Sequence, residues 1–446
     1  MTRKSNYNKF PSVAVPDSKD AVVKGWDAIA DRLRDTISRR DGNKTVVAID
    51  CYTGVDVGTI SRELRSRLKV AMAGNVEEAM KTPEAIDSLV APFLGGDDPV
   101  FGFLSGLTLA EFFDAEKVER LRRQVAKVES GIVLIVGCGA SMVEHDVLVY
   151  ADMPRWEGQL RYRRGEADNL GVKNRSADIK VQYKRAFFVD WRVCDRWKKP
   201  LISSWDFLLD TTIANEPKLA DGDAVRRGLS VSAHRPFRVV PFFDPAPRGG
   251  QWMKQFCDLD RDQSNFGWCF DCVPEENSLL LSMGDQTIEL PAMDLVLDQP
   301  VSLLGDAVHG RSEAAFPIRF DFLDTIGGGN LSFQVHPLTE YIQNTFGMHY
   351  TQDESYYMLD AGPDACVYLG LKDGIDPDQM IADLESAQAG GAAFDADRYA
   401  NCIPAKKHDH FLIPAGTVHC SGAESMVLEI SRYDDDYSRP ASESGT

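Results

Sequence analysis

The first half of the chain alternates continuous apolar runs with segments in which apolar residues recur every three or four positions. A continuous apolar run predicts a buried strand, and the three-to-four spacing predicts an amphipathic helix. Strands that alternate with helices in this way indicate an α/β domain with a mostly parallel sheet. The predicted strands are 44–50, 131–141 and 146–152, and the predicted helices are 21–40, 58–72 and 114–129.

The pattern changes within residues 214–235, and the second half consists of short runs in which apolar and polar residues alternate. Gly, Pro, Asp and Asn separate these runs, which is typical of an all-β sandwich or barrel. One helix is predicted at 376–391, where a pair of glycines marks its end. The predicted strands are 237–243, 278–284, 286–291, 330–337, 355–360, 365–371, 408–416 and 425–431.

These patterns divide the chain into four parts. Residues 1–20 are polar and without periodicity, so we expect a flexible arm there. Residues 21–225 form the predicted α/β domain, and residues 226–431 form the predicted β domain. The acidic and polar residues 432–446 are expected to form a disordered tail.

The charge of the chain narrows the classes of partner. A net charge of −19 over 446 residues argues against nucleic acid, because phosphate backbones are bound by basic surfaces. An anionic substrate would therefore need a local group of cations or a metal ion. The N-terminus has no apolar run typical of a signal peptide, and no apolar stretch reaches the roughly 18 residues of a membrane helix. We therefore expect a cytoplasmic protein that does not use a membrane as a partner.

The cysteines give no sign of a disulfide framework. There are nine, an odd number, and their scattered positions fit a reducing compartment. Cys269 and Cys272 form a CxxC pair, but two thiolates alone do not complete a structural zinc site. Buried thiols in a strand are the favoured interpretation.

Residues 46–64, VVAIDCYTGVDVGTISREL, have the layout of a phosphate-binding loop between a strand and a helix. Such a loop needs glycines for close approach of the backbone, a Lys for the β- and γ-phosphates and a Ser or Thr for magnesium. Gly54, Gly58 and Thr59 are present, but Val57 occupies the position of the Lys.

Residues 148–165, LVYADMPRWEGQLRYRRG, resemble the part of nucleoside and nucleotide kinases in which a strand ends in Asp-x-Pro and leads into an Arg-rich helix. The N-terminal half thus resembles a P-loop kinase of the uridine-kinase type. Without the Lys, stabilisation of a transferring phosphoryl group is impaired. The resemblance implies a degenerate domain, with weak nucleotide binding or a purely structural or regulatory role as alternatives to kinase activity.

Four polar residues in the β domain have the spacing of a metal site. Gln334 and His336 are two residues apart, so on a strand they would point to the same face. Glu354 begins the next alternating run, and His419 follows a Pro-Ala-Gly turn. A Gln, His, Glu and His set suits zinc and leaves a position for water or substrate. For each residue taken alone, a hydrogen-bonded side chain is a simpler interpretation than a metal ligand.

The motifs that contain these four residues carry a family resemblance. Over residues 236–430 the chain resembles the type I mannose-6-phosphate isomerases. The resemblance implies a jelly-roll, cupin-like β-sandwich with one zinc ion per chain, and an aldose–ketose isomerase that interconverts mannose 6-phosphate and fructose 6-phosphate. It also implies that Gln334, His336, Glu354 and His419 bind the zinc. The matching motifs are LSFQVHP (331–337), ESYYMLD (354–360), FLIPAGTVH (411–419) and VLEIS (427–431).

The chain departs from the family pattern just before Glu354. Family members commonly carry a Lys there, whereas this chain has Gln352 and Asp353. His349 could substitute as a polar or basic group. The phosphate of a substrate needs cations, and the nearest in sequence are Lys372, Lys406 and Lys407, for which a solvated loop is an equal alternative.

A second departure lies at the end of the chain. The family continues after the LEIS-like strand into an Arg-bearing motif and further strands, whereas this chain offers only Arg432 and Arg439. The β domain therefore looks truncated at its C-terminus, completed by another chain, or derived from an inactive relative. The catalytic residues and the oligomeric state are not predicted. The alternative function is a non-catalytic regulatory module that binds a metal and a sugar phosphate.

Overall fold

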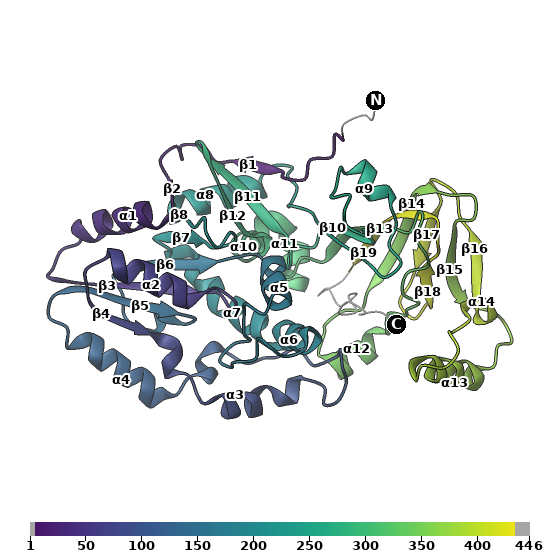
Figure 1. Ribbon diagram of the computed structural model, residues 1–446, viewed down its shortest axis with the longest axis horizontal. Helices are drawn as coiled ribbons and strands as arrows, with labels where there is room; N and C mark the ends of the chain where they lie inside the picture. The colour runs from purple at the N-terminus through teal and green to yellow at the C-terminus, as the bar shows by residue number, and fades with distance from the viewer. Residues whose placement is uncertain (1–4, 433–446) are drawn as a thin grey trace. The chain divides into compact units, whose positions relative to one another are not determined.

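The computed structural model describes residues 5–432, which form two compact units (Figure 1). The α/β unit consists of Phe10–Val240 and Pro274–Ala315. The β unit consists of Pro241–Val273, residues 316–432 and the short N-terminal stretch 5–9. Both units are therefore discontinuous in sequence. Within the described residues, no helix is long and apolar enough to cross a membrane.

The α/β unit is built on a seven-stranded sheet with the order β2-β8-β7-β6-β3-β5-β4 (Figure 1). The five strands from β7 to β4 are parallel, and β8 and β2 add an antiparallel edge. This confirms the predicted α/β class. The strands are β2 (Val22–Lys24), β3 (Lys44–Cys51), β4 (Val70–Asn75), β5 (Gly131–Gly137), β6 (Val147–Asp152), β7 (Phe207–Asp210) and β8 (Lys218–Asp221).

Helices connect these strands, and three of them lie at the predicted helices 21–40, 58–72 and 114–129. Two predictions were wrong in their extent. The helix expected at 21–40 begins at Trp26, because Val22–Lys24 form β2 and pair with β8. The helix expected at 58–72 ends at Arg67, and Val70 already begins β4. Leu68 has extended backbone angles, so the apolar residues that follow it pair with β5 instead of continuing the helix. The helices are α1 (Trp26–Ser38), α2 (Val57–Arg67), α3 (Pro83–Val90), α4 (Ala115–Ala126), α5 (Arg155–Arg163), α6 (Ile179–Arg185), α7 (Trp191–Leu201) and α8 (Gly222–Ala233).

The segment Pro274–Ala315 belongs to the α/β unit, although the sequence pattern assigned all of 226–431 to the β domain. Its hairpin of β11 (Ser278–Met283) and β12 (Gln286–Pro291) forms a small sheet with β1 (Ser12–Ala14). The predicted boundary at 225/226 falls inside α8, which the structure keeps within the α/β unit. The helices α10 (Ala292–Asp298) and α11 (Pro300–Ser312) complete the segment, and α10 packs against α8 and α7.

The strand β1 corrects the prediction of a flexible arm over residues 1–20. Val13 and Val15 are 3% and 6% exposed, and Val13 pairs with Leu281, which is completely buried. The alternation of Ser, Val, Ala and Val is too short to stand out in the sequence, yet it suffices for an edge strand. Residues 1–4 lie outside the described part of the chain.

A buried ion-pair cluster ties Pro274–Ala315 to the core of the α/β unit. Nζ of Lys198, on α7, lies 2.6 Å from Oδ2 of Asp152 and 2.8 Å from Oδ1 of Asp294. None of the three side chains is more than 1% exposed. Burial raises the pKa of both carboxyl groups, and the Lys198 ammonium opposes this shift. The cluster therefore depends on all three members.

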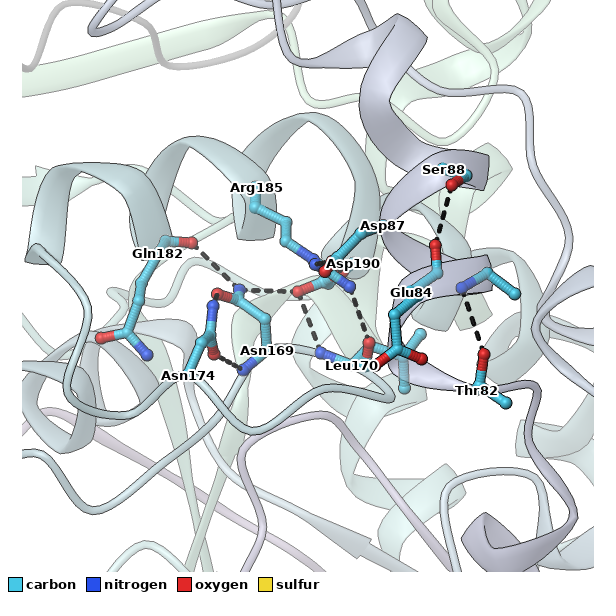
Figure 2. Close-up of polar contacts among 11 residues, drawn as sticks. Thr82, Glu84, Asp87, Ser88, Asn169, Leu170, Asn174, Gln182, Arg185 and Asp190 are labelled. Carbon is cyan, nitrogen blue, oxygen red and sulfur yellow. Dashed lines mark hydrogen bonds and ion pairs between the residues drawn. The ribbon is translucent and has the colours of Figure 1, made fainter.

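A second buried polar cluster holds the loop that precedes α6 (Figure 2). Nδ2 of Asn169 donates a hydrogen bond to Oδ2 of Asp190 at 2.7 Å, and both residues are buried. Arg185 lies 3.6 Å from the other oxygen of Asp190 and pairs with Asp87 at 2.7 Å. Asp190 ends a π-helical turn, Ala186–Asp190, that joins α6 to α7. The π-helical turn thus directs the carboxylate of Asp190 toward the loop, where its Oδ2 accepts hydrogen bonds from Asn169 Nδ2 and Leu170 N.

The β unit consists of two antiparallel sheets. The larger sheet has the order β17-β14-β19-β13-β10-β9, and the smaller one has the order β16-β15-β18 (Figure 1). A common core between them contains Tyr356, Met358 and Val427 from the larger sheet and Val367 from the smaller one. The strands are β9 (Phe242–Asp244), β10 (Trp268–Cys272), β13 (Ile318–Asp324), β14 (Asp353–Ala361), β15 (Cys366–Leu371), β16 (Ala400–Pro404), β17 (His410–Ile413), β18 (His419–Ser421) and β19 (Ser425–Arg432).

The remaining elements of the β unit are short helices, and one matches its prediction closely. The helix expected at 376–391 is α13 (Pro377–Gln388), whose N-cap is Asp376. The prediction of a strand at 330–337 was wrong. Of these residues only Gln334 forms a β-bridge, and that bridge to His419 is isolated. The tail predicted for 432–446 lies outside the described residues except for Arg432, which ends β19. The other helices are α9 (Trp252–Phe256), α12 (Thr339–Phe346) and α14 (Ala396–Tyr399).

Candidate metal centre

Three segments of the β unit bring the predicted ligands together. Glu354 is the second residue of β14, and its side chain lies on the buried face of that alternating strand. His419 is the first residue of β18, and its backbone pairs with Gln334 in the loop after β13. His336 follows Gln334 in this loop, where its carbonyl oxygen accepts a hydrogen bond from Gly416 N. The loop is thus positioned by backbone pairing with the turn before His419.

The side chains of His336, Glu354 and His419 converge on one point. Their ligand atoms all lie within 4.8 Å of one another. Nε2 of His419 is 2.6 Å from Oε1 of Glu354, and Nε2 of His336 is 3.1 Å from Oε2 of the same carboxylate. The side chains of Glu354 and His419 are completely buried, and that of His336 retains 12% of its exposure. Two imidazoles and a carboxylate at this separation are a donor set that suits a borderline divalent ion.

The tautomer of His419 is set by its second nitrogen. Nδ1 lies 2.8 Å from the carbonyl oxygen of Thr417, which can only accept a hydrogen bond. Nδ1 therefore carries a proton, and Nε2 is the nitrogen that faces Glu354 and can act as a ligand. Oε1 of Glu354 is buried and accepts no hydrogen bond. Nε2 of His419 and Oε1 of Glu354 are 2.6 Å apart, so a single cation at this point would contact both atoms.

The charge state of Glu354 fits this arrangement. Burial raises the pKa of its carboxyl group, but the contacts with His336 and His419 outweigh burial and hold the pKa well below its usual range. The carboxylate is therefore ionised at neutral pH, as a metal ligand must be.

Gln334 lies at the edge of the same cluster. Its Nε2 is 3.2 Å from Nε2 of His419. The nitrogen and oxygen of an amide exchange places when the group is turned over, and the two orientations have nearly the same shape. The amide oxygen can thus occupy the position next to His419, so Gln334 can supply a fourth, neutral ligand.

Two buried residues that the sequence interpretation did not assign to the metal site lie next to it. Nε2 of Gln352 donates to Oε2 of Glu354 at 2.8 Å and to Oε1 of Glu429 at 3.4 Å. Gln352 and Glu429 are 3% and 5% exposed. Glu429 lies on β19, opposite Tyr356 of the neighbouring strand. The available signal was the alternation in VLEIS, which turns Glu429 to the same face of the sheet as the apolar core.

The inner face of β13 extends this polar region. Arg319 and Asp321 are 3% and 7% exposed, and they pair across the strands with Ser431 and Glu429. The apolar residues of FPIRFDFLD (316–324) suggest a strand with an apolar inner face. The charged residues nevertheless occupy the inward positions, and the phenylalanines between them are half-buried on the other face.

The structure does not bring the other candidate residues into the ligand cluster. Lys372 donates to the carbonyl oxygen of Asp397, and Lys407 lies 3.9 Å from Oδ1 of Asp360. Lys372, Lys406, Lys407 and His349 are all exposed.

The two arginines and the CxxC pair also lie apart from the ligand set. The guanidinium of Arg432 packs over the ring of Tyr350 at 5.5 Å. Arg439 lies outside the described residues. Cys269 and Cys272 are free cysteines on β10, where Cys269 is buried as predicted and Cys272 is half-buried.

The loop that resembles a phosphate-binding loop follows β3 in the α/β unit. Asp56 caps α2: its carboxylate accepts hydrogen bonds from Thr59 N at 2.9 Å and Thr59 Oγ1 at 2.6 Å. A negative side chain thus occupies the helix N-terminus that would receive a phosphate. Gly54 has a φ of +88°, and its carbonyl oxygen accepts a hydrogen bond from Arg161 at 3.1 Å.

Comparison with known families and curated proteins gives one match. A family model described as a domain of unknown function (DUF8485) matches residues 25–234. This range lies in the α/β unit and contains none of the metal-site residues. No curated protein matches the chain.

Solved structures similar to this chain include isomerases of mannose 6-phosphate. The enzyme from Bacillus subtilis is 19% identical, with 45% of this chain and 62% of that chain covered and a TM-score of 0.35. A putative mannosephosphate isomerase from Archaeoglobus fulgidus is 18% identical, with 44% and 62% covered and a TM-score of 0.35. A mutant phosphomannose isomerase from Salmonella typhimurium is 12% identical, with 45% and 68% covered and a TM-score of 0.34.

The extent of these matches is limited. The chain spans less than two thirds of the length of the first two proteins. TM-scores below 0.5 do not by themselves establish a shared fold.

Proposed function

We propose that this protein is a zinc-dependent aldose–ketose isomerase that interconverts mannose 6-phosphate and fructose 6-phosphate. The observation that carries the proposal is the convergence of His336, Glu354 and His419 at one buried point. These residues, with Gln334, stand at the positions that match the zinc ligands of the type I mannose-6-phosphate isomerases. The β unit is then a jelly-roll, cupin-like sandwich whose inner face carries the site.

The chemistry of isomerisation explains the need for such a site. A proton moves between C1 and C2 through a cis-enediol, whose oxygens gain negative charge. Zinc held by the four ligands would supply Lewis-acid chemistry toward these oxygens. Glu429 is a buried carboxylate that reaches the cluster through Gln352, and it is the side chain that we assign to proton transfer.

The direct test is a coupled isomerase assay with mannose 6-phosphate and added zinc. We expect turnover by the intact protein, loss of turnover in a His336→Ala variant, and normal turnover in His410→Ala, which changes an exposed histidine of β17. No turnover by the intact protein with any divalent metal would overturn the enzymatic proposal.

One observation favours a second candidate function, a non-catalytic module that binds a metal and a sugar phosphate. Neutral Gln352 and acidic Asp353 precede Glu354, and the lysines 372, 406 and 407 are exposed and lie outside the ligand cluster. This candidate predicts bound zinc and thermal stabilisation by mannose 6-phosphate without isomerisation. The same assay, combined with a melting curve, separates the two functions.

For the α/β unit we infer a degenerate P-loop kinase-like domain. The loop after β3 lies where the strand order changes direction, with β5 on one side of β3 and β6 on the other, and ligands of open α/β sheets bind at such points. Phosphoryl transfer is not expected, because Val57 occupies the position of the Lys and the carboxylate of Asp56 caps the N-terminus of α2. Incubation with radiolabelled ATP and magnesium, followed by separation of the labelled products, tests this: we expect no phosphoryl transfer, and ATP hydrolysis sensitive to Thr59→Ala would contradict the inference.

A further inference from the structure

Gln352 has an unusual position between two buried carboxylates. It immediately precedes β14, and its side chain lies on the same face as Glu354, two residues later. The amide nitrogen has two hydrogens, and the structure directs one to Glu354 at 2.8 Å and the other toward Glu429 at 3.4 Å. With 3% exposure, Gln352 is sealed from solvent.

The contacts divide the two oxygens of Glu354 between two tasks. Oε2 receives the amide of Gln352 and also lies 3.1 Å from Nε2 of His336. Oε1 accepts no hydrogen bond and faces Nε2 of His419. Because Gln352 fixes Oε2, the rotation of the carboxylate is fixed as well, and Oε1 stays directed at the point where the ligands converge.

The neutrality of Gln352 has an electrostatic consequence. A lysine in this place would also donate hydrogen bonds to both carboxylates, but it would add a positive charge beside the metal. The amide donates without a charge, so the negative charges of Glu354 and Glu429 remain for a divalent cation to neutralise. Charges at a buried site interact strongly, because little solvent screens them.

We propose that Gln352 is a positioning residue of the metal site, which orients Glu354 through Oε2 and keeps the site negatively charged for a divalent cation. This inference rests on the proposed metal-binding function and adds a determinant of affinity to it. Outer partners of this kind typically contribute about 10–100-fold to metal affinity.

The test measures Zn²⁺ affinity of the full-length protein by competition with a chromophoric chelator. Gln352→Met keeps the length of the side chain and removes both donors, and we expect about 10–100-fold weaker binding. Gln352→Lys keeps donors and adds the charge, and we expect binding at least tenfold weaker than in the wild type. Gln379→Met is the matched control, because Gln379 is an exposed glutamine on α13 of the same unit.

Cobalt supplies a readout that a purely structural role would not change. The visible absorption of bound Co²⁺ reports the geometry of its ligands. We expect Gln352→Met to change this spectrum and Gln379→Met to leave it as in the wild type. Melting curves of the metal-free variants show whether each one is folded. If Gln352→Met does not fold, the Zn²⁺ affinity of Gln352→Lys still tests the proposal.

The outcomes separate this inference from the function on which it rests. If the wild type binds no Zn²⁺, the proposed function fails. If the wild type binds Zn²⁺ and both variants bind within twofold of it with an unchanged cobalt spectrum, the role of Gln352 is overturned while the metal site stands. If Gln352→Lys binds Zn²⁺ as tightly as the wild type and Gln352→Met binds it more weakly, the proposed effect of the neutral side chain on the charge of the site is overturned, and the orientation of Glu354 by Gln352 stands.

Discussion

At the scale of single residues, the side chains of the proposed metal site contact mainly one another. Nε2 of His419 and Oε1 of Glu354 lie 2.6 Å apart, and Nε2 of His336 approaches the other oxygen of Glu354, so the three side chains share one point that suits a cation. This makes the consequences of substitution specific. Removal of a ligand should affect metal binding far more than it affects the fold.

We therefore predict that Glu354→Gln and His419→Ala each weaken Zn²⁺ binding by at least about 100-fold, since each removes a direct ligand. Metal content after dialysis and chelator competition measure the effect. His410→Ala is the control, because this exposed histidine lies on β17. Retention of stoichiometric zinc in both ligand variants would contradict the site.

A second prediction concerns Asp324, at the end of β13. Burial raises the pKa of its carboxyl group to about 6, although Met253 N and Ile326 N donate hydrogen bonds to it. The folded state therefore holds the proton more tightly than the unfolded state. The stability that this provides is fully present below about pH 4 and is lost as the pH rises through about 6.

The variant Asp324→Asn cannot titrate, so its free energy of unfolding should lack this decline. The wild type should lose at most about 3 kcal/mol relative to the variant between pH 4 and pH 7. Urea unfolding across this range provides the measurement, and Asp364→Asn, at an exposed position, is the control. A constant difference between wild type and Asp324→Asn at every pH would show that Asp324 does not titrate in this range.

At the scale of elements, the sequence predicts most strands and helices because one face of each is buried. The inward positions of β14 and β19 follow a two-residue alternation, and α1 buries Ile29, Ala30 and Leu33 at helical spacing. The failures have a common cause. The helix expected at 58–72 and the strand expected at 330–337 contain apolar residues whose partners lie far away in sequence, and local periodicity does not record those partners.

The strand β1 shows how a distant partner creates an element. We predict that Val13→Ala lowers the free energy of unfolding of the α/β unit by about 1–3 kcal/mol, because it removes methyl groups from a side chain that is 3% exposed. Ser12→Ala, at the neighbouring exposed position, should change it little. Urea denaturation followed by tryptophan fluorescence measures both. Equal stabilities of the two variants would restore the view of residues 1–20 as a flexible arm.

At the scale of the whole molecule, the sequence could predict the two classes of structure but not how the chain is divided between them. The hairpin of β11 and β12 has the same alternation as the strands of the β unit, so nothing local assigns it to the α/β unit. Its pairing with β1 and the ion pair from Asp294 to Lys198 decide the assignment. The motifs in the sequence already point to His336, Glu354 and His419, which the structure brings together, whereas Gln352 and Glu429 become recognisable as their neighbours only once β14 and β19 are paired.

This division of the chain leads to the last prediction. In Lys198→Met, Asp152 and Asp294 lose the cation between them and remain buried side by side. Loss of one partner from a buried ionic group typically costs about 3–5 kcal/mol, so the α/β unit should unfold at a clearly lower urea concentration. The Zn²⁺ affinity should stay within about twofold of the wild type, because all four ligand residues lie in the β unit.

The triple variant Lys198→Met, Asp152→Asn, Asp294→Asn supplies the control, since it removes the charges together and should regain part of the lost stability. Measurements at urea concentrations at which Lys198→Met is still folded keep the two effects apart. Pro274–Ala315, which lie between β10 and β13 in the sequence, belong to the α/β unit, and this connection is the route by which a disturbed α/β unit would affect the β unit. A parallel loss of Zn²⁺ affinity in Lys198→Met, restored in the triple variant, would show that dependence and contradict independent behaviour of the metal site.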